Sequence, residues 1–164
     1  MSRTAYTAQI QKAAADHDLD ADLFEALVLT ESSGHADAFR FEPQYAQRYH
    51  IAEHPVYKQW PVRAVAASYG LTQIMVPTAY ELGWRDPEPE YLFIPEVNLY
   101  WGGVYLKACF DWTLRWPAAS ESSRVISALA AYNGGRNSAN TPLQTHPRNA
   151  AYAAKVLHTA TTLA

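Results

Sequence analysis

Glu31 carries the carboxyl group whose position in the sequence most favours proton transfer. The stretch DADLFEALVLTESSG, Asp20 to Gly34, predicts an amphipathic helix with Asp20 as its N-cap and Gly34 as the left-handed residue that ends it. The apolar side chains that recur there at helical spacing are Leu23, Phe24, Leu27 and Val28. Continuing this stripe by one turn leads to Glu31. A carboxyl group is therefore expected where the pattern calls for an apolar side chain.

Two effects are expected to raise the pKa of Glu31. Partial burial disfavours the ionised carboxylate, and the C-terminal end of a helix carries negative partial charge. A carboxyl group that keeps its proton near neutral pH acts as a general acid, which glycoside cleavage requires to protonate the leaving oxygen. The alternative is a structural carboxylate that caps a loop or pairs with an Arg. Glu25 falls on the other face with Asp22 and is expected to be solvated.

A second carboxyl group with a candidate role is Glu42, in the sequence RFEP. It follows Arg40 by two residues, in a segment interrupted by prolines that predicts little regular structure. Glu42 is expected either to face the same cleft as Glu31 or to form a loop salt bridge with a nearby Arg.

The composition argues against several classes of partner. The formal net charge of the 164 residues is −3, and they include no basic run of the kind that binds nucleic acid. The one cysteine, Cys109, excludes an internal disulfide, and the histidines lack ligand spacing, so neither a metal nor another cofactor is expected. No stretch has the apolar length of a secretory signal or a bilayer span, so we expect no membrane insertion.

The hydrophobic periodicity predicts one mainly α domain over residues 1–164, since 49% of the residues are hydrophobic and only 18% are charged. The predicted helices span residues 3–17, 20–34, 44–48, 77–83, 95–112, 122–133 and 150–162. The remainder of 35–61 is expected to be irregular, the stretch from 68 to the helix at 77 to be a buried loop, and 134–149 to be a loop. In helix 95–112, Gly102 and Gly103 indicate close packing of another backbone. Its stripe with Trp101, Tyr105 and Trp112 is expected to be core and not a surface that stacks on sugars.

Three separated motifs occur in a fixed order: ES at Glu31 and Ser32, GLTQIM at 70–75, and AYNGG at 131–135. With PTAYELG after the second motif and PEVNLYWGGVYL before the third, they resemble the soluble lytic transglycosylase family. That family has a lysozyme-like fold and carries an ES, a GLMQ and an AYNAG. The resemblance covers about residues 5–157, and the segment around RFEP resembles a phage-associated branch.

The resemblance implies that Glu31 is the catalytic acid and base. The candidate substrate-binding residues are Gln73, Met75, Tyr132, Asn133, Ser32 and Glu42. By the resemblance, Gln73 and Met75 line the sugar groove, whereas Tyr132 and Asn133 position Glu31 and the N-acetyl group of the substrate.

The chain departs from the family pattern in three places. Thr72 replaces the usual Met of GLMQ, which removes one expected apolar contact in the groove. The segment between ES and GLTQ is longer than usual, and a serine that the family often supplies there has no counterpart. The Glu and Thr that often precede the C-terminal Tyr are missing, since Arg148 to Ala151 stand before Tyr152.

These features predict a lytic transglycosylase that cleaves the bond between N-acetylmuramic acid and N-acetylglucosamine in peptidoglycan and leaves a 1,6-anhydro product. Its expected partner is the glycan strand, and the expected state is a monomer made in the cytoplasm that reaches the periplasmic wall by phage lysis or by tail or secretion delivery. One alternative is a bacteriolytic hydrolase of the endolysin type, in which Glu42 activates water. Another is a non-catalytic wall-binding assembly module.

Overall fold

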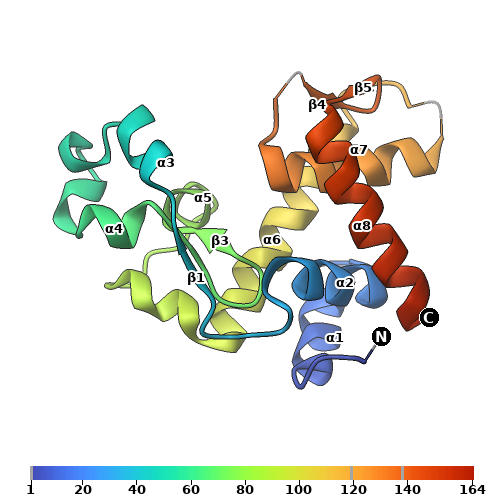
Figure 1. The fold of residues 1–164 in the computed structure, drawn as a ribbon, viewed down its shortest axis with the longest axis horizontal. Helices are drawn as coiled ribbons and strands as arrows, with labels where there is room; N and C mark the ends of the chain where they lie inside the picture. Colours follow the sequence, from blue (N-terminus) through green and yellow to red (C-terminus); the bar gives the residue numbers. More distant parts are fainter. Residues whose placement is uncertain (1, 119, 138) are drawn as a thin grey trace.

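Helices make up most of the fold (Figure 1), as the sequence predicts. The computed structural model describes residues 2–118, 120–137 and 139–164. The α-helices are α1 (Thr7–Asp16), α2 (Ala21–Ser32), α3 (Pro43–Arg48), α4 (Val62–Val65), α5 (Val76–Glu81), α6 (Pro95–Thr113), α7 (Glu121–Gly134) and α8 (Pro147–Leu163). Short 3-10 helices lie at η1 (Ile51–Glu53), η2 (Tyr57–Gln59) and η3 (Pro89–Phe93).

Two small antiparallel sheets complete the fold. The strands of the first sheet, in spatial order, are β1 (Phe39–Phe41), β2 (Ala67–Tyr69) and β3 (Ile74–Met75). In the second sheet, β4 (Asn140–Thr141) pairs with β5 (Gln144–Thr145). The prediction of irregular segments is wrong for these residues, because strands of two or three residues are too short to show alternating hydrophobicity.

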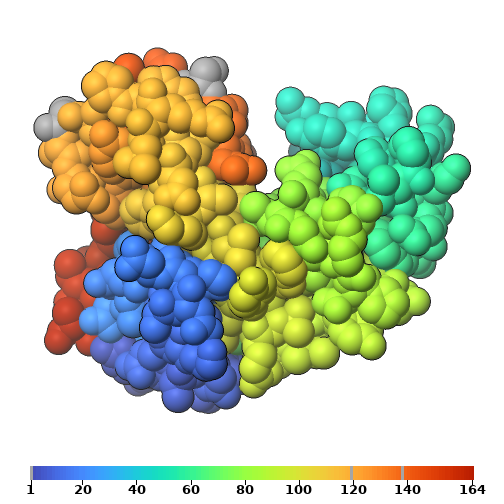
Figure 2. All heavy atoms as spheres, turned by 180° about the vertical axis from the view of Figure 1, so that it is seen from behind, coloured from blue at the N-terminus to red at the C-terminus, as the bar shows by residue number. Residues whose placement is uncertain are grey.

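The chain packs around two hydrophobic cores. The first holds side chains of α1, α2, α7, α8 and much of α6, and we call this part the helical lobe. The second holds side chains of the first sheet, α4, α5 and the 3-10 helices, and we call residues 39–93 the sheet lobe. Helix α6 joins the lobes, and its Tyr105 packs against both cores. Figure 2 shows a notch between the lobes, with α7 on one side and residues 43–60 on the other.

Helix α2 begins as predicted and ends close to the predicted residue. The Asp20 carboxylate accepts a 2.8 Å hydrogen bond from the backbone N–H of Leu23, which caps the first turn. The residue that ends the helix in the left-handed region is Ser33, with φ 55°, and Gly34 follows with φ 79°. This ending places Glu31 in the last turn of α2.

Glu25 is buried, so the prediction of a solvated side chain is wrong. Its carboxylate accepts hydrogen bonds from Arg3 Nη1 at 2.7 Å, from Thr4 N at 2.8 Å and from Thr7 Oγ1 at 2.6 Å. Burial alone would raise the pKa of Glu25, but these three donors outweigh it and the net pKa is lowered. The sequence pattern of α2 does not reveal this, because the donors come from the segment that precedes α1 and from its first residue.

The buried face of α6 differs from the predicted stripe. The residues of α6 that lie in the interior are Asn98, Leu99, Gly102, Gly103, Leu106, Cys109, Trp112 and Thr113. Trp101 is half-buried and packs against the second core, so the expectation of a core contact is confirmed, although part of its surface stays exposed. The close neighbours of Gly102 and Gly103 are the side chains of Thr72 and His17, not another backbone. A Cβ at Gly102 would collide with Thr72, so this glycine lets the loop at 70–75 approach α6.

The last two helices start earlier than predicted. Ser120 caps α7 and forms a capping box with Ser123. Helix α8 begins at Pro147, a residue suited to a first turn. Among the described residues, no helix is both long and apolar enough to cross a membrane.

Candidate active site

Glu31 lies partly buried at the end of α2, where the two lobes meet. Its Oε1 accepts a 2.5 Å hydrogen bond from the hydroxyl of Tyr152 in α8. Helices α2 and α8 pack against each other, which brings this tyrosine to the carboxyl group. Its Oε2 has no hydrogen-bond partner among the described residues. One oxygen is thus fixed, and the other remains available.

Burial is the main influence on the ionisation of Glu31 and raises the pKa above its ordinary value of 4.5. Three weaker influences lower it: the hydrogen bond from Tyr152 and the positive charges of Arg40 and Lys155. The net pKa is raised, which confirms the predicted direction. Arg40 belongs to the sheet lobe and Lys155 to the helical lobe, so charges from both lobes act on this carboxyl group.

Glu42 forms the loop ion pair that was the alternative to a role in the cleft. Arg40 Nε lies 2.5 Å from Glu42 Oε1. The Arg40 side chain is 66% exposed to solvent and the Glu42 side chain is 33% exposed. Glu42 precedes α3 without capping it through its side chain. The same Arg40 therefore forms an ion pair with Glu42 and lowers the pKa of Glu31 through its positive charge.

The loop at 70–75, which carries the GLTQIM motif, is anchored by a buried amide. Asn98 Oδ1 accepts hydrogen bonds from the N–H and the hydroxyl of Thr72, both at 2.8 Å. Asn98 Nδ2 donates to the carbonyls of Tyr69 and Leu92, both at 2.7 Å. Thr72 is fully buried, so this position contributes no surface to a groove, and the expected apolar contact is absent for a structural reason.

Two of the predicted site residues tie this loop to the helical lobe. The buried Ser32 hydroxyl donates to Leu71 O at 2.8 Å and also lies 3.1 Å from Val28 O. The buried Tyr132 hydroxyl donates to Thr72 O at 2.8 Å. Burial raises the pKa of Tyr132, and the negative charge of the nearby Glu31 raises it further. Ser32 and Tyr132 therefore hold the loop beside the end of α2.

Gln73 and Met75 remain partly accessible in the same loop. The Gln73 side-chain amide donates to Gly70 O at 3.0 Å and to Ala38 O at 3.2 Å, while its Oε1 has no partner among the described residues. Its φ of 51° is uncommon for a residue with a side chain. Met75 ends β3 and precedes α5, opposite Ser68 in β2.

Asn133 is exposed at the end of α7, next to the buried Tyr132. Its amide donates to Asn149 Oδ1 at 3.0 Å, and Asn149 in turn donates to Asn140 Oδ1 at 2.9 Å. The AYNGG motif thus connects to the second sheet through a chain of amides. The Oδ1 of Asn133 has no partner in the described part of the chain and is free to accept a hydrogen bond.

The sequence analysis missed Tyr152 and Asn98 as residues of the site. The usable sequence signal for Tyr152 is its position as the C-terminal Tyr that follows the atypical segment from Arg148 to Ala151. Asn98 stands in the PEVNLYWGGVYL stretch as a polar residue on the buried side of a helix, which is a second usable signal. Among residues 2–118, 120–137 and 139–164, no three His, Cys, Asp or Glu side chains gather as ligands for a metal ion.

Comparison with known proteins gives a family match and a structural match. The family model described as the transglycosylase SLT domain matches residues 8–155. An X-ray structure of an inactive mutant of the lytic transglycosylase Slt from Pseudomonas aeruginosa is similar, with a TM-score of 0.62 and 19% identity. That match covers 95% of this chain and 23% of the Slt chain, so this chain spans less than a quarter of that protein. No curated protein sequence gives a significant match.

Proposed function

The chain belongs to the transglycosylase SLT domain family, and on that basis we propose that it is a lytic transglycosylase that cleaves peptidoglycan. Its fold is the mainly α, lysozyme-like fold predicted from the motifs. The proposed bond is the β-1,4 link from N-acetylmuramic acid to N-acetylglucosamine. The observation that carries the proposal is Glu31, a carboxyl group with a raised pKa, one oxygen held by Tyr152 and the other without a partner in the described part of the chain.

Glu31 acts twice in this reaction. It first donates its proton to the glycosidic oxygen while the bond from C1 of the muramoyl sugar breaks, which releases the N-acetylglucosamine end. The resulting carboxylate then takes the proton of the C6 hydroxyl of the same muramoyl sugar as that oxygen bonds to C1. The product is a 1,6-anhydro ring, Glu31 regains its proton, and no water is consumed.

The proposed roles of the other residues follow their exposure. Met75, Gln73 and Asn133 are accessible and are proposed to contact the glycan strand, with the free carbonyl oxygens of the two amides accepting hydrogen bonds from acetamido groups. Ser32 and Tyr132 are buried and are proposed to act by holding the loop at 70–75 against α2.

A muramidase that uses water is the competing function, and it requires a second carboxylate as base. Inverting enzymes hold the two carboxyl groups roughly 6.5–9.5 Å apart to admit that water. Glu42 is the candidate, but it is paired with Arg40, which occupies one of its carboxylate oxygens. A one-carboxylate mechanism therefore fits the observed pairing better. Delivery to the periplasmic wall in a phage-associated, bacteriolytic context is a further part of the proposal, based on the similarity around RFEP.

The masses of the sugar products test the proposal. Purified peptidoglycan is digested with the wild-type protein, and the muropeptides are weighed by mass spectrometry. Anhydro ends are lighter than reducing ends by one water, and we expect anhydro ends with wild type and no release by Glu31→Gln. Reducing ends would establish the hydrolase instead, and absence of release by wild type would support a non-catalytic wall-binding module.

A further inference from the structure

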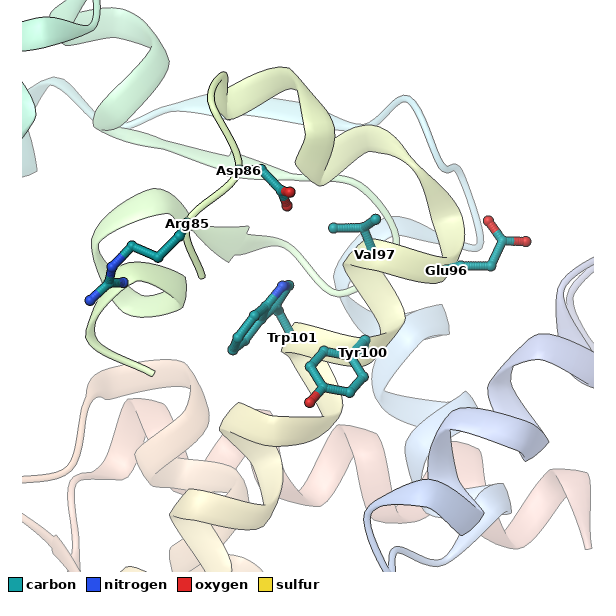
Figure 3. A pocket seen from close by; sticks show the side chains of 6 residues that line it. All are labelled: Arg85, Asp86, Glu96, Val97, Tyr100 and Trp101. Atoms are coloured by element: carbon teal, nitrogen blue, oxygen red, sulfur yellow. The ribbon is translucent and has the colours of Figure 1, made fainter. Parts of the chain in front are cut away.

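A hollow of about 490 Å³ lies between α6 and the chain that follows α5, away from the residues around Glu31. The residues that line it are Arg85, Asp86, Glu96, Val97, Tyr100 and Trp101, as Figure 3 shows. None of them is hydrogen-bonded to, or in ring contact with, Glu31, Tyr132 or Tyr152. The volume lies within the roughly 300–1,000 Å³ typical of ligand sites. The hollow is thus a second candidate site on the molecule.

Two aromatic rings from adjacent positions of α6 form one wall of the hollow. The rings of Tyr100 and Trp101 stand nearly perpendicular, at 87°, with centroids 5.0 Å apart. Tyr100 is 47% exposed, and its ring also contacts that of His17. The far edge of the Trp101 indole lies 3.7 Å from where a Cβ of Gly83 would stand, so that glycine packs against it. The indole is therefore held in place before any ligand binds.

Three charged residues line the hollow beside these rings, and Asp86 is the one whose carboxylate faces into it. In Figure 3 the Asp86 carboxylate points toward the space between Val97 and Trp101. Among the described residues, neither Asp86 nor Glu96 forms an ion pair. Arg85 instead lies 3.8 Å from the ring centroid of Tyr80 and donates to two backbone carbonyls.

The combination fits a saccharide. A fixed aromatic face stacks on the apolar side of a sugar ring, and carboxylate oxygens accept hydrogen bonds from hydroxyl and acetamido groups at its edge. The two carboxylates at the hollow, with one guanidinium already engaged elsewhere, disfavour a polyanion. The formal net charge of −3 also gives the chain no general attraction to an anionic wall, so retention there depends on specific contacts.

We propose that this hollow is a second binding site for peptidoglycan glycan, which retains the protein on the polymer while the residues around Glu31 react. This inference rests on the proposed function, since it takes the same polymer as its ligand. Trp101 and Tyr100 supply the stacking surface, and Asp86 supplies the hydrogen-bond acceptor.

The test measures binding and turnover separately. Binding to insoluble peptidoglycan, and to glycan strands from which the peptides have been removed, is measured by sedimentation in the Glu31→Gln background. Turnover of short soluble muropeptide oligomers is measured with Glu31 intact. The variants are Trp101→Ala, Tyr100→Ala and Asp86→Asn. Tyr91→Ala is the matched control, because Tyr91 is 41% exposed and does not line the hollow.

We expect Trp101→Ala and Tyr100→Ala to weaken binding to both polymers by about five- to tenfold. Asp86→Asn should also weaken binding, but by a smaller factor. Turnover of short oligomers and the melting temperature of Tyr100→Ala should remain at the wild-type level.

Equal binding by Tyr100→Ala and Tyr91→Ala would overturn the second site. Loss that appears only when the peptides are present would overturn the assignment of a sugar ligand. Parallel loss of short-oligomer turnover in Tyr100→Ala would assign the hollow to the reaction site. A wild type that binds but never cleaves would refute the proposed function and leave the binding result standing.

Discussion

The hydroxyl of Tyr152 donates a 2.5 Å hydrogen bond to the carboxyl group of Glu31, across 121 residues of sequence. The bond joins the C-terminal turn of α2 to the second turn of α8, and it favours the ionised carboxylate against the stronger effect of burial. Tyr152 therefore has two separable effects, since it fixes one oxygen in space and limits how far the pKa of Glu31 rises.

Tyr152→Phe is expected to move the pH dependence of turnover. In the proposed mechanism activity depends on protonated Glu31, so it should fall as the pH rises through the raised pKa of that residue. Without the hydroxyl that pKa rises further, and the alkaline limb of kcat/KM should shift to higher pH. The rate at the optimum should fall about tenfold, because the carboxyl group is less well positioned. Tyr105→Phe is the control, since Tyr105 donates to Ala131 O instead, and an unshifted limb in Tyr152→Phe would contradict the assignment.

Glu31→Gln is expected to abolish turnover and to stabilise the fold at alkaline pH. Loss of a general acid costs about 10²–10⁴-fold in rate. Because the folded pKa is raised, ionisation of Glu31 penalises the folded state above that pKa, and a neutral amide removes the penalty. The melting temperature of the variant should exceed that of wild type at pH 8. The difference should disappear below pH 4.5, the ordinary pKa, where both proteins are neutral at this position. A lower melting temperature at pH 8 would argue that the carboxylate is structural.

Glu42→Gln should retain most of its turnover, because Glu42 serves mainly to pair with Arg40. A largely exposed ion pair contributes about 0–1 kcal/mol, so denaturant unfolding should show at most that loss. Two results together would identify Glu42 as the base of a hydrolase. The wild-type protein would produce reducing ends, and Glu42→Gln would be inactive with the wild-type melting temperature.

Arg40→Gln should raise the pKa of Glu31, because it removes a nearby positive charge. The alkaline limb of its pH profile should therefore move to higher pH.

Asn98→Ala is expected to impair both stability and turnover. The substitution removes the Asn98 partner of the buried N–H of Thr72 and of the carbonyls of Tyr69 and Leu92, and each buried group left unsatisfied costs about 1–3 kcal/mol. Urea unfolding should show a loss of about 3 kcal/mol or more. Gln59→Ala removes an exposed amide with one hydrogen bond and is the control, expected to change little. A wild-type urea midpoint for Asn98→Ala would mean that the loop at 70–75 does not depend on this anchor.

Glu25 is expected to contribute to acid sensitivity without affecting turnover. Its folded pKa is lowered, so its stabilising contribution is complete above the ordinary value of 4.5 and is lost as the pH falls through the lower folded value. Glu25→Gln should therefore lose about 1–3 kcal/mol at pH 7, through weaker hydrogen bonds to a neutral amide. The gap to wild type should close in strong acid, and chemical denaturation at several pH values measures it. A gap that stays constant from pH 7 to pH 2 would assign the effect to shape and not to charge.

Local signals predicted the parts of the fold that local contacts determine. Asp20 was recognisable as an N-cap because its acceptor serves a backbone N–H three residues later. The apolar stripe of α2 likewise predicted that Glu31 lies on the buried side of the helix, because helical spacing is also a local property. Glu25 was misplaced because its partners, Arg3 and Thr4, reach it from a segment whose path the periodicity of α2 does not encode.

The contacts that complete the site were beyond local patterns. Position 72 is an example, because a Thr in place of Met suggested a missing groove contact. In the structure Gly102 leaves room for the Thr72 side chain in the interior, where Thr72 donates a hydrogen bond to Asn98. Tyr152 likewise becomes a partner of Glu31 only through the way α8 docks on α2. The short strands of the first sheet depend on pairing between segments that are distant in the sequence. A pattern of two or three residues does not predict such pairing.

The anchoring of the loop at 70–75 has a consequence for motion. Ser32 and Tyr132 bind its carbonyls from the helical lobe, and Asn98 binds it from the helix that joins the lobes. A motion that separated this loop from the helical lobe would have to break these buried hydrogen bonds together. The loop at 70–75 is thus fixed to the helical lobe and to α6 when the chain folds, and the proposed glycan strand would meet it already in place.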